Sequence, residues 1–159
     1  MNQCASYENQ IYQVTSMFPN YEPAYSILTI LPYGFFYAIN NIANGLNTAE
    51  MGIDIQFSTI VGYYECVNGT TLHLSGFAYA YKSQNIAVMT TRDRSFLHEY
   101  YLYFPSNDSS KCTGQVSYTF FKLGTSPIDP QNQPIFSGLV ANLTCSMMNG
   151  RNYVWPTIN

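Results

Sequence analysis

Charged side chains are scarce in this chain. Asp, Glu, Lys and Arg make up 9% of its 159 residues, whereas a soluble domain usually has about 25%. The six basic residues are scattered, and the net charge is −3. Because nucleic acid binding needs clustered Lys and Arg, we expect no nucleic acid partner. Hydroxyl groups, amides and attached glycans are expected to keep the protein soluble, as in an extracellular glycoprotein.

Long apolar segments are absent as well. The longest, residues 27–39, is interrupted by Pro32 and Gly34, and a membrane helix needs about 20 apolar residues. We therefore expect no membrane span. Residues 1–4 do not have the basic start and apolar core of a signal peptide, so we expect that such a peptide has been removed.

The sequence also lacks catalytic and metal-binding motifs. It contains no GxSxG, GxxxxGK[ST], HExxH or EF-hand pattern, and no Cys/His cluster with zinc spacing. His73 and His98 fall within expected strands, where each is predicted to be neutral and hydrogen-bonded. Neighbours such as His98 and Glu99 point to opposite faces of a strand. We expect no catalytic residue, metal or cofactor; a barrel isomerase using His73 and Glu65 is the least favoured alternative.

The chain does contain four cysteines and three N-glycosylation sequons of the pattern Asn-X-Ser/Thr. Four cysteines in a chain of this size favour disulfides, which form in oxidising compartments. Together with the sequons they predict a secreted, extracellular protein with N-linked glycans. The sequons begin at Asn68, Asn107 and Asn142, and the cysteines are Cys4, Cys66, Cys112 and Cys145.

Alternating apolar and polar residues predict strands along most of the chain. The polar segment 41–54 contains the turn signal Asn44-Gly45, and residues 46–52 are expected to form a short helical turn. Asn68-Gly69 favours a tight hairpin between the fourth and fifth strands. The eight candidate strands cover residues 10–18, 26–31, 35–40, 56–67, 70–81, 96–104, 113–123 and 139–147.

This strand order predicts an all-β fold with one domain over residues 1–159. A single eight-stranded antiparallel up-and-down barrel at about residues 10–147 is favoured, because closure removes exposed sheet edges. A β-sandwich is the alternative. Small residues on one face of the fifth strand, Gly76, Ala78 and Ala80, predict a tight interior. The residues expected to face the interior and to line a ligand site are Leu72, Leu74, Val116, Tyr118, Phe120, Leu139 and Leu143.

Residues 26–37 combine an apolar strand, the turn Pro32-Tyr33-Gly34 and an aromatic strand. Gly62-Tyr63-Tyr64-Glu65 and the strand around Phe77 follow. In these stretches the chain resembles secreted lipocalin-like, calycin-type β-barrel proteins of largely uncharacterised function. The family usually has an acid at the position of Tyr33 and a Trp at that of Tyr64. The resemblance implies an eight-stranded barrel with a small apolar cavity or a packed interior, and no catalytic residues.

Strand order predicts the end of the barrel at which each segment lies. Odd strands start, and even strands end, at one rim, so all four cysteines and the three sequons are expected there. Two disulfide patterns are open: Cys4 with Cys145 and Cys66 with Cys112, or Cys112 with Cys145 across the last hairpin. In a further alternative, Cys4 bridges to another chain.

The opposite rim is expected to carry the longest loops, residues 19–23, 41–54, 82–93 and 125–136. Long loops on a rigid scaffold often bind ligands. We therefore expect a non-enzymatic secreted glycoprotein that binds a small apolar ligand or a partner at this unglycosylated rim. The alternative is a structural or adhesive subunit of an extracellular assembly, with terminal extensions that contain Cys4, Tyr7, Tyr153 and Trp155.

Overall fold

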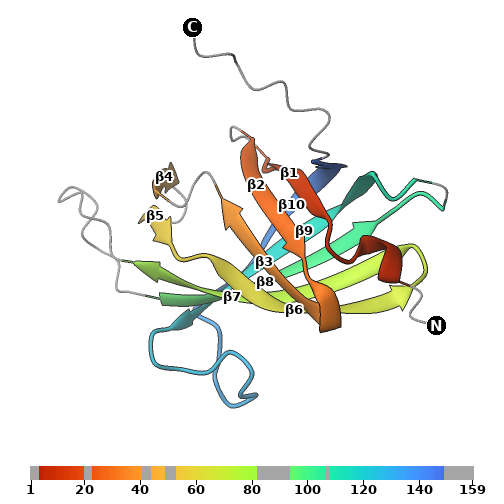
Figure 1. Cartoon of the computed structure of the whole chain (residues 1–159). Helices are drawn as coiled ribbons and strands as arrows, with labels where there is room; N and C mark the ends of the chain where they lie inside the picture. Colours follow the sequence, from red (N-terminus) through yellow and green to blue (C-terminus); the bar gives the residue numbers. More distant parts are fainter. Residues whose placement is uncertain are drawn as a thin grey trace, which may run out of the picture.

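A computed structural model of the chain describes residues 4–19, 23–40, 44–48, 53–81, 94–106 and 108–148. Strands make up most of this part of the chain (Figure 1). In chain order the elements are η1 (Ala5–Tyr7), β1 (Ile11–Met17), β2 (Ala24–Ile30), η2 (Pro32–Gly34), β3 (Phe35–Asn40), β4 (Asn44–Thr48), β5 (Ile53–Phe57), β6 (Ile60–Asn68), β7 (Thr71–Tyr81), β8 (Arg94–Tyr103), β9 (Lys111–Lys122) and β10 (Phe136–Met147).

The strands form a meander that closes on itself. The order β7-β6-β3-β2-β1-β10-β9-β8 returns to β7 through the β7–β8 pairing, and every pairing is antiparallel. The first and last strands complete the circle from Tyr12 opposite Met147 to Met17 opposite Asn142. The predicted eight-stranded up-and-down barrel is therefore confirmed, and the β-sandwich alternative is wrong.

Two segments differ from the sequence predictions. Residues 44–48 form strand β4 by pairing with β5, so the helical turn expected at residues 46–52 is wrong for residues 46–48. Residues 49–52 lie outside the described residues. The predicted strand 56–67 is divided at Ser58, whose hydroxyl accepts a hydrogen bond from the Tyr79 amide at 3.1 Å. Both halves, β5 and β6, still pair with β7. In β4, pairing with β5 overrides the local turn preference of Asn44-Gly45.

Alternation along each strand places one set of side chains inside the barrel. In β7 the inward positions begin with Leu72 and Leu74 and continue with the small residues Gly76, Ala78 and Ala80, all buried. A Cβ at Gly76 would lie 2.5 Å from the Phe36 ring, so glycine makes room for this aromatic side chain. The interior is thus packed with rings, as the small residues predicted. Its largest fully buried side chains include Tyr12, Phe36, Phe96, His98, Tyr100 and Phe120.

Candidate functional site

Two disulfides lie at one end of the barrel. Cys4 is bonded to Cys66, and Cys112 is bonded to Cys145. Cys112 and Cys145 face each other directly in the β9–β10 register, and η1 carries Cys4 to the end of β6. The pairing across the last hairpin is therefore confirmed. The alternatives, Cys4 with Cys145 or an intermolecular bridge through Cys4, are wrong.

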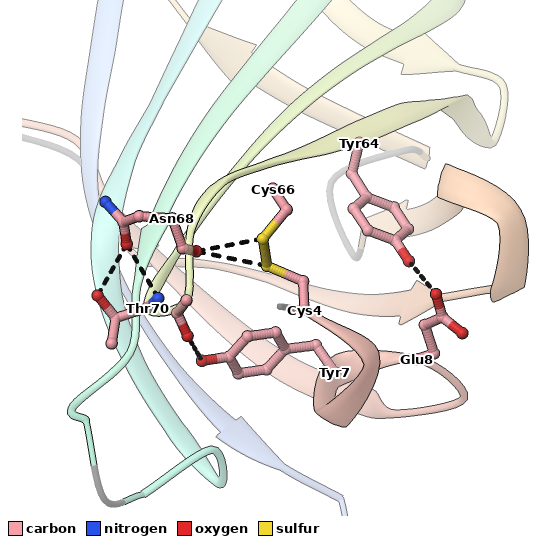
Figure 2. Close-up of a disulfide and its surroundings, with 8 residues drawn as sticks. Cys4, Tyr7, Glu8, Tyr64, Cys66, Asn68 and Thr70 are labelled. Atoms are coloured by element: carbon pink, nitrogen blue, oxygen red, sulfur yellow. Dashed lines mark hydrogen bonds between the residues drawn. A yellow bond between two sulfur atoms is a disulfide. The ribbon is translucent and has the colours of Figure 1, made fainter. Parts of the chain in front are cut away.

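The N-terminal segment closes the same end of the barrel (Figure 2). The Tyr7 hydroxyl donates to the Gly69 carbonyl oxygen at 2.9 Å, and the Tyr7 ring packs 4.2 Å from that of Phe104. The Tyr12 hydroxyl donates to the Ser109 carbonyl oxygen at 3.0 Å. The Tyr64 hydroxyl donates to Glu8 at 3.3 Å. The Cys4–Cys66 disulfide and the Tyr7 and Glu8 contacts therefore join the N-terminal segment to β6, to the β6–β7 hairpin and to the end of β8.

The described sequons do not share one position. Asn68 lies at the exposed β6–β7 hairpin of the closed end, as predicted. Its Oδ1 accepts hydrogen bonds from the Thr70 amide and hydroxyl, both at 2.9 Å. Asn142 lies in the middle of β10, on the outer wall, with its Oδ1 accepting from Gln115 at 3.2 Å. Its predicted place at the cysteine rim is wrong, because β10 begins earlier than expected. Asn107 lies outside the described residues.

The predicted interior residues all lie in the core or pack against it. Leu139 is partly buried and packs against the core near the start of β10. Whether this set contacts a ligand stays a prediction. The six that are buried outright are Leu72, Leu74, Val116, Tyr118, Phe120 and Leu143.

For the interior residue His98, the hydrogen bond predicted from the sequence is not found among the described residues. It occupies the middle of β8, opposite Gly76 on one side and Tyr118 on the other, and is 0% exposed. Its ring lies 4.5 Å from Phe96 and 4.7 Å from Tyr118. Neither ring nitrogen has a hydrogen-bond partner among the described residues, and the same is true of the Tyr100 hydroxyl. The expected hydrogen-bonded histidine is thus neutral but unpaired within the protein.

Burial fixes the protonation of this group of side chains. Desolvation lowers the pKa of His98 to about 3. It also raises the pKa of Tyr100 and of Tyr118 far above the ordinary range. All three are therefore neutral near pH 7 and act as hydrogen-bonding groups. The sequence alone indicates that His98 faces the interior. Alternation along β8 places it on one face with Phe96, Tyr100 and Leu102.

An unpaired polar group in a protein interior is costly. Each one destabilises the fold by about 1–3 kcal/mol, and native structures keep few of them. His98 and Tyr100 place three such atoms, two nitrogens and one hydroxyl oxygen, within one region of the barrel. The ring centroids of the two residues are 6.2 Å apart. A molecule that carries one hydrogen-bonding group would relieve this penalty.

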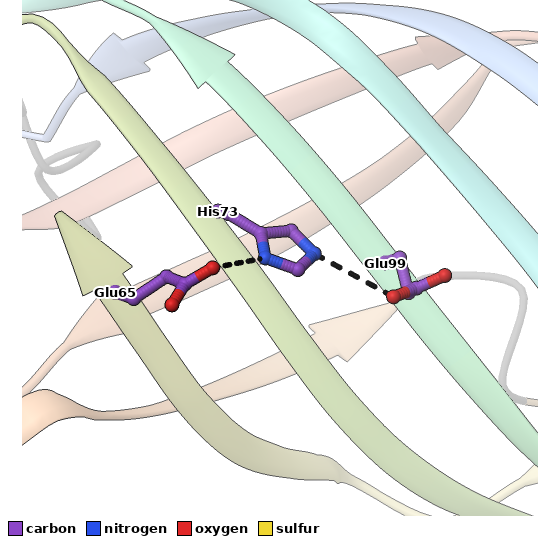
Figure 3. A network of polar contacts seen from close by, with 3 residues as sticks. All are labelled: Glu65, His73 and Glu99. Atoms are coloured by element: carbon purple, nitrogen blue, oxygen red, sulfur yellow. Dashed lines mark hydrogen bonds and ion pairs between the residues drawn. The ribbon is translucent and has the colours of Figure 1, made fainter. Parts of the chain in front are cut away.

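The other histidine belongs to the outer wall (Figure 3). His73 Nδ1 lies 2.9 Å from Glu65, and Nε2 lies 3.5 Å from Glu99. The His73 ring stacks on Tyr101 at 4.4 Å. Because these side chains cross the outside of β6, β7 and β8, the residues named for an isomerase do not converge in the interior.

Neither a metal site nor a membrane-spanning helix is found in residues 4–19, 23–40, 44–48, 53–81, 94–106 and 108–148. This part of the chain brings together no group of three or more His, Cys, Asp or Glu side chains that could hold a metal ion. No helix in it is long and apolar enough to cross a membrane.

Comparison of this chain with protein-family models, with curated proteins and with solved structures finds no match.

Proposed function

We propose that this protein is a secreted, non-enzymatic glycoprotein of lipocalin-like architecture that binds a small molecule inside the barrel. The observation that carries the proposal is the fully buried His98, whose ring nitrogens have no partner among the described residues, beside the equally unpaired Tyr100 hydroxyl. A protein interior rarely keeps such groups together without a ligand or water to bind them.

The two ends of the barrel differ, which supports entry from one side. The disulfide-bonded end is closed by η1 and its tyrosine contacts. At the other end, Phe57 packs edge to face on Phe96 at 5.2 Å, and Phe96 stacks on Phe120 at 5.1 Å. These rings separate His98 from the rim. A ligand therefore enters past aromatic side chains, which can change rotamer without breaking the sheet.

The surroundings of His98 define the chemistry of the ligand. Aromatic rings occupy most of the interior, so the ligand is small and has an apolar, preferably flat, body. His98 and Tyr100 require one hydroxyl, amide or similar group on it, because an apolar molecule would leave them unpaired. This narrows the apolar ligand expected from the sequence to one with a single polar group.

The protonation of the site supports binding in preference to catalysis. A general acid or base works best with a pKa near the working pH. His98, with a pKa of about 3, takes up no proton near neutrality. Tyr100 and Tyr118 release none, because burial raises their pKa. These groups can orient a ligand but not exchange protons with it.

Secretion is supported by the two disulfides and by the sequon at Asn68. Disulfides persist in oxidising compartments and are rare in the cytosol. The Asn68 side chain is exposed at the end of β6, where its Oδ1 accepts a hydrogen bond from the hydroxyl of Thr70 in the same sequon. The cysteines and sequons are also the features from which the sequence predicts an extracellular protein.

Phenol and benzene test the proposed ligand class, since they share a ring and differ by one hydroxyl. We expect phenol to raise the melting temperature and to shift the NMR resonances of the His98 ring, and benzene to do so much less. His98→Phe should abolish the phenol effect, whereas His73→Phe, on the outer wall, should retain it. The proposal fails if phenol has no effect and protein from its native source carries no small molecule in native mass spectrometry.

A further inference from the structure

We infer that the outside of β8, β9 and β10 binds the N-linked glycan that Asn142 carries. The inference rests on the proposed secretion, because N-linked glycans belong to secreted chains, but it does not depend on ligand binding at His98. We call this surface the glycan site. It comprises Tyr103, Thr113, Gly114, Gln115, Asn142 and Leu143.

The amide of Asn142 is already oriented on the barrel wall. Gln115, which lies opposite it in the β9–β10 register, donates from Nε2 to Asn142 Oδ1 at 3.2 Å. This bond uses the oxygen and not Nδ2, the atom that carries an N-linked glycan. Because glycosylation does not alter the oxygen, the bond to Gln115 can persist in the modified protein and keep the first sugar near β9.

A hollow of about 470 Å³ lies beside this amide. The exposed side chains of Thr113 and Gln115 on β9 and of Tyr103 on β8 surround it. Gly114 and Leu143 complete its lining, but Gly114 has no side chain and that of Leu143 is buried in the core. The hollow is therefore an open depression with hydroxyl and amide groups at its edge. Such groups both donate and accept hydrogen bonds, as sugar hydroxyls require.

Tyr103 adds an aromatic ring to the glycan site. It lies opposite Thr113 in the β8–β9 register and is 50% exposed, whereas the ring of Tyr101 is stacked on His73 at 4.4 Å. Because β9 separates β8 from β10, Tyr103 and Asn142 are two strand spacings apart, roughly 10 Å. The pair of GlcNAc residues at the base of an N-linked glycan can cross this gap and pack an apolar ring face on the tyrosine.

The chain itself supplies the occupant of this surface, since Asn142 is both the sequon residue and part of the hollow. On its other side Asn142 lies opposite Met17 of β1, which is 49% exposed and has no hydrogen-bond donor. Tyr25 on β2 is as far from β10 as Tyr103, and both lie in the row of Thr144. The hollow beside Tyr25 does not include Asn142. Hydrogen-bonding groups therefore favour the Tyr103 side.

Occupancy of Asn142 is measured by peptide mass mapping of protein from a eukaryotic secretory host. We expect a glycan on Asn142 that Thr144→Ala removes and Thr144→Ser retains. A protein that is glycosylated at Asn68 but not at Asn142 would overturn the inference and leave the proposed secretion standing. A protein with no N-linked glycan at all would overturn both.

A double-mutant cycle tests contact between the glycan and Tyr103. Tyr103→Ala should lower the melting temperature about 2–4 °C more in the protein glycosylated at Asn142 than in the Thr144→Ala background, because only the first loses a sugar contact. Tyr25→Ala is the matched control, at 43% exposure, and should have the same effect in both backgrounds.

NMR of the glycosylated protein gives a second readout that does not depend on stability. Resonances of the base GlcNAc residues should be shifted by the Tyr103 ring and should return to free-glycan positions in Tyr103→Leu. Equal effects of Tyr103→Ala in the two backgrounds, together with free-glycan resonances in the wild type, would overturn the inference. A glycan-dependent effect of Tyr25→Ala in place of Tyr103→Ala would overturn it too, since the glycan would then lie over β1.

Discussion

At the scale of single residues, His98 shows how its surroundings change the chemistry of a side chain. An exposed histidine titrates near neutrality and is well solvated in both forms. His98 lies among Phe96, Tyr100 and Tyr118 with no polar partner among the described residues, so its charged form is excluded. It is a candidate ligand anchor because it is a neutral donor and acceptor in an apolar region.

The same burial predicts how stability depends on pH. The pKa of His98 is 6.5 in an ordinary setting and about 3 in the folded chain. Below pH 6.5 the unfolded chain takes up a proton that the folded chain does not. The free energy of unfolding therefore decreases as the pH is lowered from 8 to 5. The loss amounts to about 2 kcal/mol between pH 8 and pH 5.

His98→Phe should remove this part of the pH dependence. Urea unfolding of the variant and the wild type at pH 8 and pH 5 measures the difference, and the contribution of the carboxylates cancels in the comparison. His73→Gln, on the outer wall, serves as a control for the loss of a histidine. Equal pH slopes for the wild type and His98→Phe would show that His98 is solvated or paired in the folded protein.

At the scale of elements, glycines decide how closely the strands and rings approach. Gly76 faces inward on β7, where an added Cβ would lie 2.5 Å from the Phe36 ring and 2.7 Å from Ile60. Gly69, in the β6–β7 hairpin, has nothing within 4 Å of the same position. Packing therefore requires glycine at position 76, whereas the Gly69 position has room for a side chain.

Alanine substitutions at Gly76 and Gly69 should differ in their effect on the free energy of unfolding. Gly76→Ala should reduce the free energy of unfolding by about 1–3 kcal/mol, since the added methyl group would overlap the Phe36 ring and Ile60. Gly69→Ala should change it by less than about 1 kcal/mol. Thermal or urea unfolding measures both variants. A stable Gly76→Ala protein would mean that Phe36 can leave its place over β7.

The sequence predicts which side chains of a strand face the interior, but it does not predict which residues of other strands they contact. Alternation in residues 70–81 predicts which side chains of β7 share a face. It does not reveal that Phe36 lies over Gly76, because that contact depends on the register of β3, β6 and β7. The division of residues 56–67 at Ser58 was missed for the same reason.

At the scale of the whole molecule, the barrel has one fixed end and one end with long connections. The disulfides, η1 and the Asn68 hairpin all gather at the fixed end. Ligand entry is proposed at the other end. The proposed glycan at Asn68 hydrates the fixed end without blocking entry.

Expression in a eukaryotic secretory host tests this arrangement. We expect secreted protein with no free thiol and with a glycan at Asn68 that peptide N-glycosidase removes. Thr70→Ala should lower the mass by one glycan, because the sequon is lost, whereas Thr70→Ser retains the sequon and the mass of the glycan. An unchanged glycan mass in Thr70→Ala would remove Asn68 as a modification site.

The sequence by itself determined the fold class, the closed meander and the face on which most core residues lie. These features depend on a repeat of two residues and on local turn signals such as Asn68-Gly69, which are written in consecutive residues. The sequence also placed the four cysteines at one end of the barrel.

Only the tertiary structure decided the pairing of Cys4 with Cys66, the strand at Asn44–Thr48, the mid-wall position of Asn142 and the isolation of His98. Each depends on which residues from distant strands meet after closure. A linear pattern shows that His98 points inward, but only the packed barrel shows that no described polar side chain reaches it.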